Sequence, residues 1–138
     1  MKPIGYRMQG FSLLELMITV AIVAVMAMVI YPTYVSYVRK GYRAEAVASL
    51  TGISLAEEQW RATHTTYGTL ANVWGAVTTT ASGRYTLAVS AVSASGYTVT
   101  ATAVGDQAND ASSGQSCASL VLTTSNTVTT NTPTVCWS

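Results

Sequence analysis

The chain has 138 residues, about the length of one domain, and it carries few charges. Charged residues make up only 9% of the sequence, the formal net charge is +1, and 49% of the residues are hydrophobic. This composition is poor for a charged cytosolic surface. It is more typical of a densely packed extracellular polymer.

The first ten residues, Met1 to Gly10, are short and polar and contain Lys2 and Arg7. They lack the apolar core of a cleavable secretion signal, because the apolar run comes later. Between Glu15 and Arg39 lie 23 residues without a charge. As a helix they would span roughly 35 Å, enough to cross a bilayer. A lone carboxylate at the start of such a segment is costly and therefore indicates function.

The run Gly10-Phe11-Ser12-Leu13-Leu14-Glu15, followed by the apolar helix, resembles the signal of type IV pilin precursors of the type IVa class. The resemblance implies that a prepilin peptidase cuts between Gly10 and Phe11 and that the new N-terminal Phe11 is methylated. It also implies that Glu15 pairs with the amine of a neighbouring subunit during assembly. The alternative is an uncleaved signal anchor with a stray acid.

The resemblance divides the chain into a leader at 1–10, a transmembrane and filament-core helix at 11–38, and a head at 39–138. It implies an inner-membrane precursor with its head in the periplasm, and later an extracellular filament. Expected partners are other pilin subunits, the prepilin peptidase, the inner membrane and its pilus assembly machinery. Counting positive charges on either side of the span does not fix the orientation.

One helix is expected from Phe11 to about Ala62, with a kink or local melting at Pro32. After Arg39 it becomes amphipathic, and its apolar stripe suits packing on a sheet. Glu57 falls in the same arc and is interpreted as the point where the stripe leaves the core. The stripe comprises Tyr42, Ala46, Leu50, Ile53 and Trp60.

A basic cluster follows the apolar run and has two interpretations. The favoured one is anchoring at lipid headgroups, and the other is a salt bridge to Glu57 or Glu58 of a neighbouring subunit. The cluster consists of Arg39, Lys40 and Arg43.

Alternating patterns predict a hairpin from strands at 84–92 and 96–103, and a third strand at 117–124. Residues 126–130 suit a fourth strand or a turn, and residues 63–83 and 105–116 suit loops. The sequence thus predicts an α+β fold, with a long helix packed on three or four antiparallel strands. This is also the type IV pilin fold that the resemblance implies.

Cys117 and Cys136 lie on the side of the span expected to be exported, so they predict one disulfide. The alternative is two buried free thiols. The tail that ends in Cys136-Trp137 resembles a subgroup of minor pilins. This favours a minor pilin that supports pilus assembly, adhesion, twitching motility or DNA uptake.

No catalytic site, metal site or cofactor is expected. His64 is the only histidine and is interpreted as a surface residue, and Asp106 and Asp110 do not form an EF-hand pattern. After Ala62 the head has one basic residue, Arg84, so DNA is a less favoured partner. The alternatives kept are a major pilin, a type II secretion pseudopilin and a DNA-binding competence pilin. The cysteines argue against the pseudopilin.

Overall fold

The structure is a computed structural model of the chain and describes residues 10–137. Helix α1 (Leu13–Arg61) carries Pro32 in its interior, as expected from the sequence. The chain divides into two compact units, Met1–Val35 and Ser36–Ser138. The predicted leader lies outside the described residues, apart from Gly10. The kink at Pro32 and the three-part division of the chain stay predictions.

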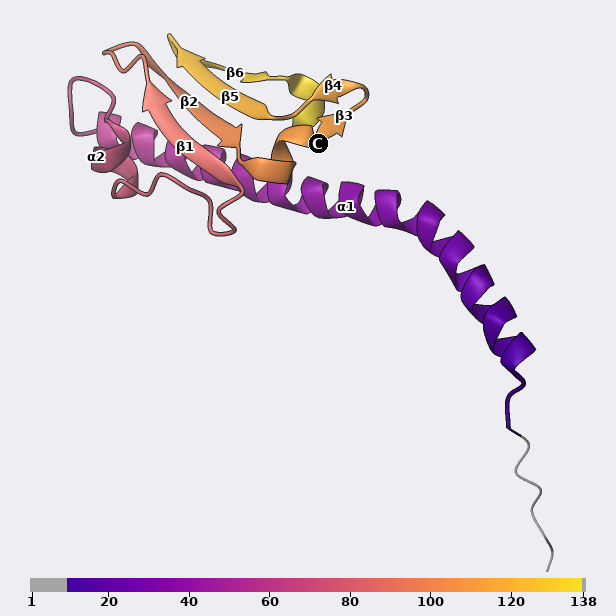
Figure 1. Cartoon of the computed structure of the whole chain (residues 1–138). Helices are drawn as coiled ribbons and strands as arrows, with labels where there is room; N and C mark the ends of the chain where they lie inside the picture. Colours follow the sequence, from indigo (N-terminus) through magenta and orange to yellow (C-terminus); the bar gives the residue numbers. More distant parts are fainter. Residues whose placement is uncertain (1–9, 138) are drawn as a thin grey trace, which may run out of the picture. The chain divides into compact units, whose positions relative to one another are not determined.

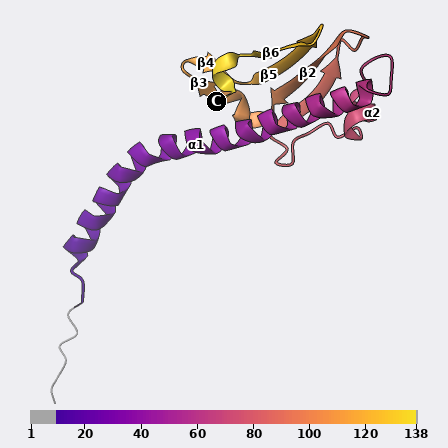
Figure 2. The same ribbon diagram turned by 180° about the vertical axis from the view of Figure 1, so that it is seen from behind.

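The second unit contains a sheet of four antiparallel strands in the order β1-β2-β5-β6. They are β1 (Tyr85–Ser90), β2 (Gly96–Ala103), β5 (Ser119–Ser125) and β6 (Val128–Thr132). In this unit the sheet lies along one face of the C-terminal half of α1 (Figures 1 and 2). The α+β prediction is therefore confirmed, with four strands.

The two hairpins follow from turn chemistry. Between β1 and β2, Ser93 closes the turn by donating its backbone N–H to the carbonyl of Gly96 and accepting the Gly96 N–H on its hydroxyl. Between β5 and β6, Asn126 and Thr127 both have positive φ, at 47° and 70°. These two residues form the turn, so the fourth strand begins two residues later than expected.

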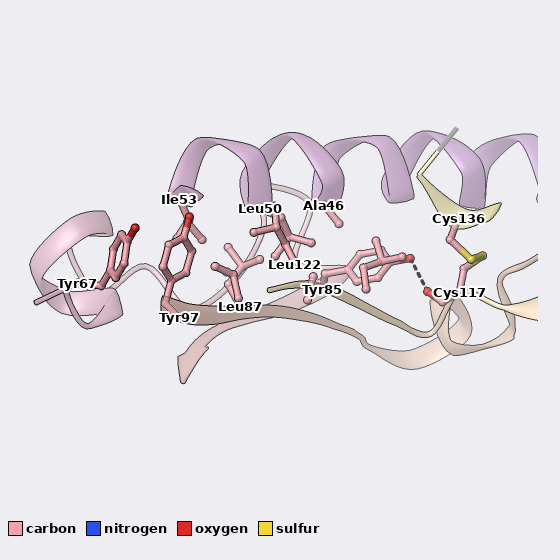
Figure 3. Close-up of a cluster of buried hydrophobic side chains, with 13 residues drawn as sticks. Ala46, Leu50, Ile53, Tyr67, Tyr85, Leu87, Tyr97, Cys117, Leu122 and Cys136 are labelled. Carbon is pink, nitrogen blue, oxygen red and sulfur yellow. Dashed lines mark hydrogen bonds between the residues drawn. A yellow bond between two sulfur atoms is a disulfide. The ribbon is translucent and has the colours of Figure 1, made fainter. Parts of the chain in front are cut away.

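The core lies between α1 and the inner face of the sheet (Figure 3). Alternate residues of β1, β2 and β5 point into it, because successive side chains of a strand face opposite sides. From the helix, Ala46, Leu50 and Ile53 are fully buried. The strands contribute Tyr85, Leu87, Tyr97, Val99, Ala101, Leu120 and Leu122.

Two details of the helix stripe differ from the sequence interpretation. Glu57 does not mark the edge of the core, since it is fully buried. Trp60 is only partly buried and is not among the side chains packed against the core. Helical periodicity placed both residues in the correct arc but could not show how far the sheet extends along α1.

The two predicted loops contain short elements that the sequence interpretation missed. Residues 63–83 include α2 (Leu70–Trp74), which a Thr69–Asn72 capping box begins and a left-handed Gly75 ends. Residues 105–116 include the 3₁₀ helix η1 (Gly105–Asn109) and the strands β3 (Ala111–Ser112) and β4 (Gln115–Ser116). The 3₁₀ helix η2 (Thr134–Cys136) follows β6. Elements of two to five residues are too short for periodicity to reveal them.

Leu50→Ala tests whether the head depends on the helix face. Leu50 is fully buried, so the truncation is expected to lower the free energy of unfolding by about 2–5 kcal/mol. The measurement is denaturant unfolding of the head fragment Ser36–Ser138, the unit that holds the whole core. Leu55→Ala is the matched control, because Leu55 lies on the same helix and is 62% exposed. Equal losses in the two variants would contradict the packing described.

Candidate assembly site

The N-terminus of α1 is built by its own sequence. The Ser12 hydroxyl accepts the backbone N–H of Glu15 at 3.1 Å, so Ser12 acts as the N-cap of the helix. Glu15 then lies in the first turn, where the helix dipole favours a negative charge. Within residues 10–137, no basic side chain forms an ion pair with Glu15. Its carboxylate is therefore available to a group from outside the described chain.

The apolar half of α1 is uncovered. Every side chain from Phe11 to Tyr34 is exposed, and Phe11 itself is 81% exposed. In the described part of the chain, α1 is long and apolar enough to cross a membrane, and its most apolar stretch has no buried residue. An apolar hollow of about 480 Å³ lies on this segment and is lined by Val23, Met26, Ala27, Ile30, Tyr31 and Tyr34. This surface requires lipid or other apolar helices around it.

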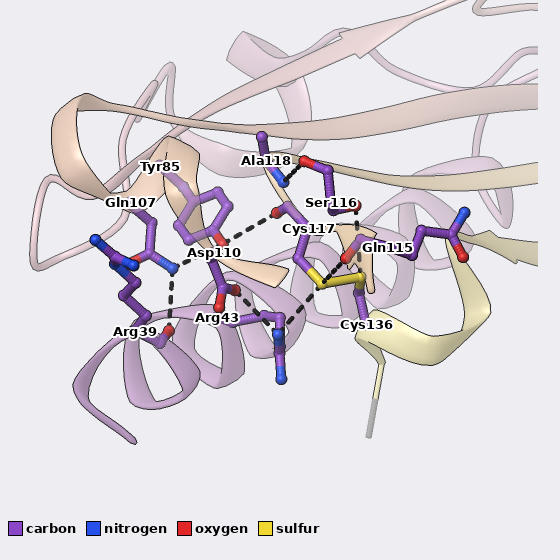
Figure 4. The surroundings of a disulfide bond; sticks show 10 residues. All are labelled: Arg39, Arg43, Tyr85, Gln107, Asp110, Gln115, Ser116, Cys117, Ala118 and Cys136. Carbon is purple, nitrogen blue, oxygen red and sulfur yellow. Dashed lines mark hydrogen bonds and ion pairs between the residues drawn. A yellow bond between two sulfur atoms is a disulfide. The ribbon is translucent and has the colours of Figure 1, made fainter. Parts of the chain in front are cut away.

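The basic cluster at the start of the head is divided between different roles. Arg43 is only 4% exposed, and its Nη1 donates to Asp110 Oδ2 at 3.0 Å and to Cys117 Sγ at 3.2 Å (Figure 4). Anchoring at lipid headgroups is therefore wrong for Arg43. Lys40 is exposed, whereas Arg39 is half-buried and donates to the carbonyl of Asn109.

A second polar chain joins the helix to the disulfide. Gln107 is buried and donates its side-chain amide to the carbonyl of Arg39 and to the hydroxyl of Tyr85, both at 3.0 Å. Tyr85 donates in turn to the carbonyl of Cys117 at 3.3 Å. Burial raises the pKa of the Tyr85 hydroxyl, which keeps its proton available for this bond. No sequence pattern marks Gln107, because its hydrogen-bond partners come from distant segments.

Cys117 and Cys136 form the predicted disulfide, with their Cα atoms 5.7 Å apart. The alternative of two free thiols is wrong. The bond attaches η2 to the segment before β5, and both sulfur atoms are buried beside the Arg43–Asp110 ion pair (Figure 4). Asp110 is therefore engaged in an ion pair and is not a free calcium ligand.

Comparison with known families fits this geometry. A family model described as type IV minor pilin ComP, DNA uptake sequence receptor, matches residues 32–121, about two thirds of the chain. A model described as the prokaryotic N-terminal methylation motif matches residues 6–31. The chain belongs to the type IV minor pilin family. This minor pilin is accordingly anchored in the inner membrane as a precursor and becomes part of an extracellular pilus.

One curated relative comes from another filament-forming system. The minor pilin is similar to the type II secretion system core protein G of Pectobacterium carotovorum subsp. carotovorum, with 30% identity over 63 residues. The match covers 46% of this chain and 40% of that protein. The minor pilin thus spans well under half of the relative's length.

The predicted site residues of the minor pilin lie in two places. Gly10, Phe11 and Glu15 lie at the exposed start of α1, whereas the two cysteines lie in the head. Their roles in cleavage, methylation and assembly stay predictions, as does the link between the Cys-Trp ending and a particular subgroup. The sequence interpretation missed the Arg43–Asp110 pair, which only the loop geometry brings together.

Glu57 is a second buried charge-bearing group in the head of the minor pilin. Its Oε2 accepts the backbone N–H of Gly68 at 2.7 Å, and its Oε1 has no hydrogen-bond partner among the described residues. Burial raises the pKa of Glu57, and the neighbouring Glu58 raises it further. An intersubunit salt bridge through Glu57 is therefore excluded by its burial.

The raised pKa of Glu57 predicts a pH dependence of stability. The folded head favours the protonated form of Glu57. The contribution of this protonation to the stability of the head is therefore fully present below the ordinary pKa of 4.5. It is lost as the pH rises through the folded pKa. Glu57→Gln is expected to remove this loss, measured as melting temperature from about pH 4 to about pH 8. Asp106→Asn is the control, because Asp106 is an exposed acid elsewhere on the head. A Glu57→Gln profile parallel to the wild type would refute the assignment.

Proposed function

We propose that this minor pilin is cut between Gly10 and Phe11, is methylated on Phe11, and packs with other pilins into a filament that serves DNA uptake. The observation that carries the proposal is the uncovered apolar half of α1, directly after the Gly10–Glu15 motif. The methylation-motif match over residues 6–31 supports the same processing. The prepilin peptidase and the inner-membrane assembly machinery are the partners that this pathway requires.

The physical argument for assembly is the cost of exposing this helix. Burying apolar surface is favourable by roughly 25 cal/mol per Å², so the segment is stable in lipid and unstable in water. A filament core built from copies of the same helix replaces lipid with apolar side chains. The subunit can therefore leave the membrane without exposing Leu13 to Tyr34 to water.

We expect Glu15 to fix the axial alignment of each subunit with its neighbour in the filament. Cleavage after Gly10 creates a cationic amine on Phe11, and Glu15 has no cation partner within the described chain. At about 4 Å the two charges attract by about 4 kcal/mol at an effective dielectric of about 20, before desolvation is subtracted. A subunit docked out of register would bury both charges unpaired, which is strongly unfavourable.

Glu15→Ala is expected to leave cleavage intact but to abolish or strongly slow filament assembly, because the Phe11 amine loses its partner. Precursor and mature masses in membranes, and the protein content of sheared filaments, measure the two steps separately. Gly10→Val is the control for processing and is expected to accumulate as precursor. Asp106→Ala, which removes an exposed acid from the head, is the control for charge. Normal incorporation of Glu15→Ala into filaments would overturn the register argument.

The DNA part of the proposal is supported by the family match, which describes DNA uptake sequence receptors. The charge of the head limits how DNA can be held. In the described head, Arg43 is already paired with Asp110. The cations left for phosphate contacts are Arg39, Lys40, Arg61 and Arg84, of which Lys40 and Arg84 are exposed.

The small number of available cations predicts that the affinity of the head for DNA depends only weakly on salt concentration. Each neutralised phosphate of duplex DNA contributes a slope of about −0.9 to the plot of log K against log salt, so four cations give at most about −3.6. The measurement is a titration of DNA with the head fragment at several salt concentrations, with and without Arg84→Ala. A slope steeper than this limit would show that DNA binding needs cations from several subunits. Absence of any binding would overturn the direct DNA role while leaving filament assembly untouched.

A second candidate function is that of a pseudopilin in type II secretion, which the similarity to core protein G supports. The two functions separate in a deletion strain. Loss of DNA uptake with normal protein secretion supports the proposed function. Loss of secretion with normal DNA uptake supports the pseudopilin.

A further inference from the structure

Trp60, in the last turn of α1, stands apart from the core. It is neither in the buried cluster nor among the side chains packed against that cluster. Its indole ring instead stacks on the ring of His64, with centroids 3.7 Å apart and planes 5° from parallel. Trp60 is half-buried, and its ring packs beside Gly68 in the loop between α1 and α2.

The stacked pair lines a hollow between the C-terminal turns of α1 and α2. It is a shallow hollow, open to solvent, of about 390 Å³. Polar and aromatic side chains dominate the lining, with one alanine and one valine beside them, and it contains no acidic group and no Lys or Arg. The polar and aromatic members are Gln59, Trp60, Thr63, His64 and Asn72. We name this hollow the Trp60 pocket.

Several polar groups of the Trp60 pocket have defined hydrogen-bonding roles. Asn72 Oδ1 accepts from the backbone N–H and hydroxyl of Thr69, which leaves its side-chain NH₂ free to donate. His64 Nδ1 lies 2.9 Å from the carbonyl of Trp60 and 3.0 Å from the hydroxyl of Thr63, whereas Nε2 forms no hydrogen bond among the described residues. The side-chain amide of Gln59 forms no hydrogen bond among the described residues and offers both a donor and an acceptor.

The pocket is also pre-organised by the backbone around it. The Glu57–Gly68 hydrogen bond holds the loop that joins α1 to α2. A Cβ at Gly68 would lie 2.6 Å from Val73 Cγ1, so only glycine allows α2 to approach this closely. Rigid walls reduce the ordering cost of binding and therefore favour a real site.

We propose that the Trp60 pocket binds a neutral saccharide ring. The aliphatic C–H face of a pyranose packs on a flat aromatic surface, here the outer face of the exposed His64 ring, because the indole face that meets His64 is already covered. The hydroxyl groups of a pyranose both donate and accept hydrogen bonds. Other ligand classes fit less well. An anion would find no Lys or Arg and a cation no carboxylate in the lining, while a purely apolar ligand would leave the Gln59 and Asn72 amides unpaired.

This inference does not depend on the proposed function, because every lining residue belongs to the head. It assigns a site and a ligand class, a neutral glycan, to the adhesion that the sequence predicts. Filament assembly through the apolar half of α1 is expected to be unchanged when the pocket is altered. The failure of one proposal can therefore be distinguished from the failure of the other.

The test uses the mature chain in a detergent without a sugar headgroup. The probes are the methyl glycosides of glucose, galactose, mannose and N-acetylglucosamine, followed through the indole N–H signals of Trp60, Trp74 and Trp137. At least one glycoside is expected to shift the Trp60 signal selectively, with a Kd of about 1–10 mM, as a single small ring allows. No selective shift with any of the four at about 100 mM would overturn the proposal.

Two variants assign the binding to the pocket. His64→Ala removes the stacked ring and Gln59→Ala removes an amide, and each is expected to weaken binding about fivefold to tenfold. Gln115→Ala is the matched control, because Gln115 is an exposed glutamine elsewhere on the head. Melting curves check that each variant is folded. Unchanged affinity in both pocket variants, or a Trp60 shift with thymidine and with none of the glycosides, would reject a saccharide site.

Discussion

The structure depends on one constraint: a single helix must satisfy two different surroundings. The second half of α1 buries Ala46, Leu50 and Ile53 against the sheet, and this contact supplies the helical side of the core. The first half buries nothing within the described chain, although it is the most apolar part of the sequence. Since exposed apolar surface is unfavourable in water, the first half of α1 is stable only in lipid or among other apolar helices. Membrane insertion and filament packing are therefore two solutions to the same physical requirement.

The sequence predicted most of what periodicity can encode. The bounds of α1, the β1–β2 hairpin and the inward positions of Leu120 and Leu122 all follow from repeats of 3.6 or 2 residues. A repeat is visible only over several turns, so periodicity does not distinguish the five-residue helix α2 from a loop. The N-terminal motif could be read directly, because all its members are adjacent in the chain.

The parts that could not be predicted are long-range polar contacts. Arg43 looked like a membrane anchor because it follows an apolar run and has basic neighbours. Its actual partner, Asp110, is 67 residues away, and its buried position depends on how η1 and β3 fold back on α1. Gln107 and Glu57 show the same limitation. A sequence shows that a group is polar, but whether the fold will bury and pair it is decided by segments far away in the chain.

The distribution of charge limits how the head can bind a partner electrostatically. Its ion pair and its most buried acid are internal, so the few remaining cations are spread along α1 and the start of β1. A surface of this kind gives little electrostatic steering, and contacts that act at short range become decisive. Hydrogen bonds and aromatic stacking act at that range, and the end of α1 presents both where Trp60, His64 and Asn72 meet. A head with few free cations is thus suited to contacts made by shape and hydrogen bonding more than by charge.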